Sequence, residues 1–161
     1  MKKEILKGVL LTGLLSVMIS CNSKKEETGT TAIDKEQIKK EIQAREDAFA
    51  EVFNGGIVKE IGYYADNAIS FYPNRPPLIG RQAIISFFTS TVAPKSNKIS
   101  FTTKDVFVSG DGNFVAETGY YKVIDSTNTA INTGNYISLF EKRDGKYVCV
   151  RDMSSSDMPV Q

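Results

Sequence analysis

The second half of the chain alternates strand-like runs with short turns, and this pattern limits the fold more than any other feature. Runs rich in β-branched and aromatic residues occupy 99–108, 113–124, 129–142 and 146–153. The turns between them include Gly110-Asp111-Gly112 and Asp144-Gly145, and an Asp-Gly pair between two strands is typical of a hairpin. Consecutive hairpins predict a four-stranded antiparallel meander. Strands this long in a small domain predict a strongly bent sheet.

The segment before the meander has the periodicity of helices. Asp34 is a candidate N-cap, with Gln37 at the third helical position, and Gly55-Gly56 marks the end of the helix. Apolar residues recur between them at helical spacing, at Ile38, Ile42, Phe49, Val52 and Phe53. We expect a second short helix at 57–64, a short strand at 68–72, a proline-rich loop at 73–77 and a third helix at 81–90. Helices first and strands second predict an α+β fold, with three N-terminal helices packed on one face of a bent antiparallel sheet that has a short first strand before the meander.

The first 20 residues have the composition of a secretory signal peptide. Basic residues come first, at Lys2, Lys3 and Lys7. An apolar run at 9–19 and the pair Ser20-Cys21 follow, and the run is too short to span a bilayer. A cysteine directly after the small residue resembles a bacterial lipoprotein signal, which implies cleavage before Cys21 and its acylation. The alternative is a plain hydrophobic helix with an incidental cysteine.

The lipoprotein resemblance implies a location for the protein. We expect it in the bacterial cell envelope, lipid-anchored to the outer membrane on the periplasmic side or at the surface. Residues 21–32 are polar and without periodicity, so we expect a flexible tether, although an interaction site is an alternative. A single domain then occupies 33–161.

Composition excludes several kinds of chemistry. The chain has no histidine, which rules out serine–histidine and cysteine–histidine nucleophile pairs and removes the commonest metal ligand. The carboxylates lack calcium-loop spacing, so we expect no metal and no cofactor. A net charge of +1 provides no basic surplus for nucleic acid. With Cys21 acylated, Cys149 has no cysteine partner, and we interpret it as a buried apolar residue.

Several stretches together resemble the nuclear transport factor two-like superfamily, in its SnoaL-like and ketosteroid-isomerase-like branch. The matching stretches are Ala48-Phe49, Phe53-Asn54-Gly55-Gly56, Tyr63-Tyr64-Ala65-Asp66-Asn67-Ala68, Gly80-Arg81-Gln82-Ala83-Ile84, Gly134-Asn135-Tyr136, 140–147 and 150–157. The resemblance covers about 33–159. It implies a cone-shaped fold whose helices and bent sheet enclose a pocket. Members of the superfamily include isomerases, dehydratases, polyketide cyclases and proteins without known activity.

The resemblance also implies where this sequence would carry the catalytic groups of a ketosteroid isomerase. The catalytic base of ketosteroid isomerases falls at Tyr72, their tyrosine donor near Ala48, and their protonated aspartate near Ile137 or Ser138. None of these positions carries the required group. The histidine–aspartate pairs of related dehydratases and cyclases are impossible without histidine. The remaining candidates for a general base are Glu117 and Asp152.

We also name candidate ligand-binding residues. Arg45 interrupts the apolar stripe of the first helix, and it would form a polar cluster with Glu117 or Asp152 if it points inward. The aromatic candidates are Tyr64, Tyr72 and Tyr121, and Arg75 lies in the proline loop, where it would meet a ligand carboxylate. The alternatives are a structural ion pair, a plain aromatic core and a solvated loop charge.

Strand parity limits how the last strand contributes to such a site. In an unbroken strand, alternation places Tyr147, Cys149, Arg151 and Met153 on one face and Asp152 on the other. Arg151 and Asp152 therefore cannot both line the pocket. Parity alone does not show which of the two faces of the strand lines the pocket.

Two functions follow from these observations. The first is a membrane-anchored, noncatalytic domain whose pocket binds a small apolar or aromatic molecule, or which binds a protein partner. The second is an isomerase, lyase or hydrolase that uses a pocket carboxylate as general base. The resemblance further implies a homodimer, because relatives often pair through the open face of the sheet.

Overall fold

The structure of the protein is a computed structural model, and it describes residues 33–92 and 96–159. The predicted signal peptide at 1–20, the tether at 21–32 and Cys21 lie outside the described residues. None of the helices in the described ranges is long and apolar enough to cross a membrane.

The first helix, α1 (Lys35–Asn54), begins and ends where the sequence predicts. Asp34 accepts a hydrogen bond of 3.0 Å from the backbone N–H of Gln37, which satisfies one of the free donors of the first turn. Gly55 caps the other end, and Gly56 adopts a positive φ of 75° that favours glycine. The buried face of the helix follows i, i+4, i+7 and i+11 spacing, at Ile42, Glu46, Phe49 and Phe53.

The strands form one six-stranded sheet in the order β2-β1-β6-β5-β4-β3. They are β1 (Tyr64–Phe71), β2 (Leu78–Ile79), β3 (Lys98–Val108), β4 (Phe114–Ile124), β5 (Ala130–Arg143) and β6 (Lys146–Ser156). The last four strands pair antiparallel in sequence order, which confirms the predicted meander. The expectation of a wholly antiparallel sheet is wrong, because β1 pairs with β6 in parallel. The first strand is also longer than predicted, since it begins at Tyr64 rather than at residue 68.

The described helical elements differ from the three predicted helices. Residues 57–64 contain only a 3₁₀ turn, η1 (Val58–Glu60), because Tyr64 already pairs with Cys149 of β6. Tertiary pairing thus overrides the local apolar pattern. The predicted third helix consists of α2 (Arg81–Phe87) and a π-helical turn, η2 (Phe88–Val92). Residues 33–92 and 96–159 therefore form an α+β fold with two α-helices.

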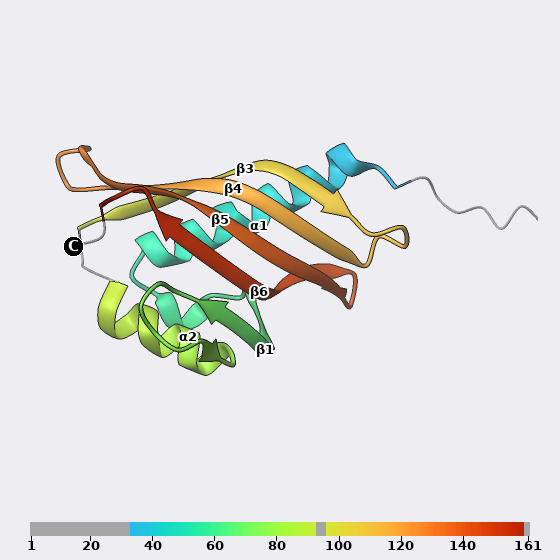
Figure 1. The fold of residues 1–161 in the computed structure, drawn as a ribbon, viewed down its shortest axis with the longest axis horizontal. Coiled ribbons are helices and arrows are strands. Elements are labelled where there is room, and N and C mark those ends of the chain that lie inside the picture. The colour runs from blue at the N-terminus through green and yellow to red at the C-terminus, as the bar shows by residue number, and fades with distance from the viewer. Residues whose placement is uncertain (1–32, 93–95, 160–161) are drawn as a thin grey trace, which may run out of the picture. The chain divides into compact units, whose positions relative to one another are not determined.

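The helix α1 and the sheet form two layers. Figure 1 shows α1 running behind β3, β4 and β5, while α2 lies beside β1 and the near side of β4, β5 and β6 carries no helix. Side-chain hydrogen bonds attach α1 to β3: the Asn54 amide pairs with both the N–H and the C=O of Ile99, at 2.8 and 2.9 Å. Gln43 makes similar bonds to Thr103 and Phe101. The core lies between α1 and the inner face of the sheet.

A bulge in β6 changes which side chains face the core. In the pairing of β5 with β6, Phe140 lies opposite Cys149 but the neighbouring Leu139 lies opposite Arg151, so Val150 is an extra residue. The extra residue shifts the alternation by one position. Cys149 and Asp152 consequently share the inner face, and Arg151 is exposed. The parity expected for an unbroken strand therefore fails at Val150.

Candidate functional site

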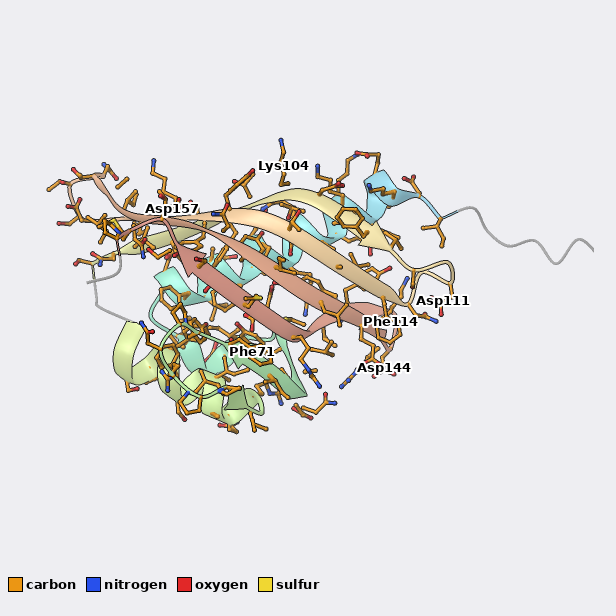
Figure 2. The ribbon with its side chains drawn as sticks, viewed as in Figure 1. Phe71, Lys104, Asp111, Phe114, Asp144 and Asp157 are labelled. Atoms are coloured by element: carbon orange, nitrogen blue, oxygen red, sulfur yellow. The ribbon has the colours of Figure 1, made fainter. Side chains whose placement is uncertain are left out.

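A cavity of about 280 Å³ lies between α1, the α2–η2 segment, β1 and the inner face of the sheet. Its lining is mainly aromatic, with Phe49, Phe88, Tyr64, Tyr72, Tyr121 and Tyr136 among its walls. The polar groups of the lining include Glu46 and Asp152. Figure 2 shows the side chains that fill the space between the helices and the sheet. An apolar cavity with a few converging polar groups is the usual form of a small-molecule site.

Glycines make room for two of the lining tyrosines. A Cβ atom at Gly134 of β5 would collide with the ring of Tyr121 and with the backbone carbonyl of Ser155. A Cβ atom at Gly119 of β4 would collide with the end of the Tyr136 side chain. The tyrosines therefore depend on neighbouring strands that lack a side chain at these two points.

The structure places three of the five candidate ligand-binding residues around this cavity. They are Tyr64, Tyr72 and Tyr121. Arg75 is not a lining residue, and its guanidinium lies over the ring of Phe87, 4.1 Å from the ring centroid. That position gives the charge a cation–π contact in the proline loop.

The expectation that Arg45 points into the cavity is wrong. Its Nη2 donates a 2.8 Å hydrogen bond to the carbonyl of Gly62, and the side chain lines a separate hollow that includes Tyr147. The reason is the geometry of α1: Glu46, four residues after Ile42, continues the buried stripe. The polar cluster in the core is thus built on Glu46 and contains no arginine.

Asp152 reaches the cavity because of the bulge at Val150. The Tyr64 hydroxyl donates a 2.9 Å hydrogen bond to its Oδ2, while Oδ1 is buried and makes no hydrogen bond of ordinary geometry within the described structure. Burial raises the pKa of Asp152 from an ordinary value of 3.8 to about 6, against the opposing effects of the hydroxyl groups of Ser70 and Tyr64. A carboxyl group with this pKa exchanges protons near neutral pH, which suits a general base.

The other two buried carboxyl groups form a pair at the wall of the cavity. Glu46 is 2% exposed and Glu117 is completely buried. The Tyr63 hydroxyl donates to Glu46 Oε1 at 2.5 Å. Glu117 Oε1 accepts from Thr103 at 2.6 Å and from Tyr136 at 2.8 Å. The residues of this polar network come from α1, the segment before β1, β3, β4 and β5.

Burial makes both carboxyl groups of the network hard to ionise. It raises the pKa of Glu46 well above its usual range, with the charge of Glu117 acting in the same direction. Burial also raises the pKa of Glu117. Glu46 lines the cavity and Glu117 lies behind it.

Sequence reasoning missed Glu46 although a signal for it was present. The residue lies on the course Ile42, Glu46, Phe49, which is as good a helical stripe as the one drawn through Arg45. Its partner Tyr63 comes from the segment before β1, and no local pattern links that tyrosine to α1. Within the described residues, no three Cys, Asp or Glu side chains are arranged to hold a metal ion.

This fold and this cavity define a class of protein, an α+β domain whose helices and bent sheet enclose a small-molecule pocket. The family model described as "SnoaL-like domain" matches residues 47–150. The chain therefore belongs to the SnoaL-like domain family, within the nuclear transport factor two-like superfamily. No curated protein matches the chain.

Solved structures with the same fold include proteins of several kinds. A domain of unknown function with a cystatin-like fold from Nostoc punctiforme is 14% identical, with a TM-score of 0.64 over 74% of this chain and 76% of the other. A ketosteroid isomerase-like protein from Erwinia carotovora atroseptica is 17% identical, with a TM-score of 0.59 over 74% of this chain and 96% of the other. A hexachlorocyclohexane dehydrochlorinase, LinA-type3, from Novosphingobium barchaimii is 13% identical, with a TM-score of 0.60 over 76% and 88%. These identities establish the fold and nothing finer.

Replacement of Asp152 by Asn should stabilise the protein at neutral pH. A pKa that is higher in the folded than in the unfolded chain means that the folded state loses stability as pH rises between the two values, here from 3.8 to about 6. The asparagine side chain would keep an acceptor for Tyr64 and carry no charge. The free energy of unfolding of Asp152→Asn should therefore exceed that of the wild type at pH 7.5 by up to about 3 kcal/mol, with little of this gain present at pH 4.

Urea denaturation at both pH values measures this gain. The matched control is Asp144→Asn, because Asp144 is exposed in the β5–β6 turn (Figure 2) and asparagine suits its positive φ of 51°. A difference between wild type and Asp152→Asn that is the same at pH 4 and pH 7.5 would contradict the account of a desolvated carboxylate.

Proposed function

We propose that the cavity binds a small, mainly apolar molecule that carries one polar group. The observation that carries this proposal is the combination of aromatic walls with the desolvated carboxyl groups of Glu46 and Asp152. The aromatic rings supply the favourable transfer of an apolar body from water. The carboxyl groups, placed at the walls, orient the polar group of the ligand. Binding of this kind requires no turnover.

A cavity-filling substitution tests this binding. Ser154 lines the cavity, whereas the next residue, Ser155, is exposed. We expect Ser154→Phe to reduce the binding of N-phenyl-1-naphthylamine, a neutral fluorescent apolar probe, by at least about tenfold, a loss of about 1.4 kcal/mol. Ser155→Phe adds the same ring outside the cavity and should bind as the wild type does.

Titration of the probe by its fluorescence enhancement measures both variants. Circular dichroism shows whether each variant is folded. Equal binding by wild type and Ser154→Phe, with both folded, would contradict the cavity as the binding site.

A second candidate function is catalysis of proton transfer, and one observation favours it. Asp152 is a buried carboxyl group at the wall of the cavity with a pKa of about 6, and Tyr64 holds its Oδ2. In this function Asp152 takes the proton from the carbon beside a ligand carbonyl and returns it to a different carbon. Tyr72 and Tyr121 also line the cavity, and their hydroxyl groups would donate to the oxygen that becomes negatively charged.

Isomerisation of 3-cyclohexen-1-one to its conjugated isomer, followed by ultraviolet absorbance, tests this second function. If the protein is an isomerase, the wild type accelerates the reaction and Asp152→Asn lowers the rate by about 100-fold or more. The Asp144→Asn control keeps the wild-type rate. Equal rates with wild type and Asp152→Asn would remove Asp152 from catalysis of this reaction.

We further propose that the mature protein is anchored to the bacterial envelope through lipid on Cys21. The support is the order of basic segment, apolar run, Ser20 and Cys21. When the chain is expressed in a bacterium supplied with labelled palmitate, we expect label and membrane association for the wild type and neither for Cys21→Ser. Cys149 is the second cysteine and is buried, so Cys149→Ala should retain the label. Label on Cys21→Ser would contradict the proposal.

The outer face of the sheet supports a homodimer as the assembly. Ile137, Met153 and Phe71 lie side by side on β5, β6 and β1, and they are 51%, 54% and 41% exposed. We expect a dimer mass by light scattering at high micromolar concentration and a monomer mass for Ile137→Lys. The control is Ile79→Lys on β2, where Ile79 is 74% exposed at the edge of the sheet. A monomeric wild type would contradict the proposal.

A further inference from the structure

The buried carboxyl groups around the cavity have no cationic partner. The ion pairs in the described part of the chain join Lys35 to Asp105, Arg81 to Asp66 and Arg143 to Glu141. None of them includes Glu46, Glu117 or Asp152. Among the described residues that line the cavity, none is Lys or Arg. The described carboxyl groups at the cavity therefore have no positively charged side chain that offsets their charge.

The position of the two nearby arginines strengthens this point. Arg45 faces away from the cavity and is bound to the carbonyl of Gly62. Arg75 lies over the ring of Phe87 and is not part of the lining. Neither guanidinium pairs with a carboxyl group of the cavity. A buried carboxylate without such a partner is costly, and a bound cation would offset that cost.

Only neutral groups hold the carboxyl group of Asp152 among the described residues. Tyr64 donates to its Oδ2, and the hydroxyl of Ser70 also lowers the pKa of this carboxyl group, but neither hydroxyl carries a positive charge. An ammonium group supplies N–H donors and a positive charge together, and a charge-assisted hydrogen bond is stronger than a neutral one. Neutral donors such as a hydroxyl would satisfy the hydrogen bond without compensating the charge.

The walls are suited to the same kind of ligand. Rings of Tyr64, Tyr72, Phe88 and Tyr121 line the cavity. The negative faces of aromatic rings attract a cation, most strongly where water is excluded. The same rings also accept the apolar body of the molecule. An anion, in contrast, would meet carboxyl groups and ring faces of the wrong sign.

We propose that the cavity selects a small organic cation, an amine on an aromatic or alicyclic body, with its ammonium group at the carboxyl group of Asp152 and its body among the tyrosine and phenylalanine rings. This inference rests on the proposed binding function and names the class of ligand for the same cavity.

Three probes of similar size and different charge test the inference. They are 2-phenylethylamine, a cation at pH 7.5, 2-phenylethanol, which is neutral, and phenylacetate, an anion. Ligand-observed nuclear magnetic resonance with the purified protein measures the dissociation constant of each. We expect the amine to bind at least about tenfold more tightly than the alcohol, and phenylacetate to bind most weakly of the three.

Variants then locate the charge that selects the amine. Asp152→Asn should weaken the binding of the amine by about tenfold and change the binding of the alcohol by no more than about twofold. Asp144→Asn, an exposed turn variant, should change neither. Circular dichroism shows whether Asp152→Asn is folded. If it is not, the wild-type ranking of the three probes still decides the inference.

Each outcome bears on a different claim. If the alcohol or phenylacetate binds as tightly as the amine, selection of a cation is overturned while binding of a small aromatic molecule stands. If the amine is preferred but Asp152→Asn keeps that preference while folded, Asp152 as the recognising group is overturned. If none of the three probes binds at millimolar concentration, and N-phenyl-1-naphthylamine also fails to bind, the proposed binding function itself fails.

Discussion

The buried network of Glu46, Tyr63, Glu117 and Tyr136 is the constraint on which the rest of the structure depends. Its hydrogen bonds of 2.5 to 2.8 Å join α1 to the residue before β1, and β4 to β5, where an apolar core would be expected. Two carboxyl groups in such a place are tolerated only if burial favours their neutral forms and if hydroxyl groups donate to them. A network of buried carboxyl groups is therefore less stabilising than an apolar core in the same place. That cost is why we regard the cavity beside it as functional.

The bulge at Val150 determines which face of β6 carries Asp152. Without the extra residue, Asp152 would point to the outer face together with Val150 and Val148. With it, Asp152 joins Tyr64 at the cavity, and β6 can still complete both the antiparallel meander and the parallel pairing with β1. The extra residue in β6 thus turns the carboxyl group of Asp152, which exchanges protons near neutral pH, toward the cavity.

Much of the fold could be predicted from the sequence because its signals are local. The cap at Asp34, the end of α1 at Gly55 and the hairpins of the meander depend on neighbouring residues, and the structure has them where they were predicted. The parallel pairing of β1 with β6 depends on residues about 85 positions apart, and no local pattern indicates it. The site shows the same division. The aromatic lining at Tyr64, Tyr72 and Tyr121 was accessible from composition and spacing, whereas Glu46 was overlooked beside Arg45. The cavity-facing position of Asp152 required knowledge of a bulge.

Membership of the SnoaL-like family explains the cone-like arrangement but does not supply the chemistry. The acidic groups that line the cavity, Glu46 and Asp152, come from α1 and β6. The most direct measurement is a high-resolution structure of the protein purified from a bacterium that produces it. The account predicts density for a small molecule in the cavity, with a polar group at Asp152 and its body against Tyr64 and Tyr121. An empty cavity, closed by collapse of these rings onto one another, would contradict it.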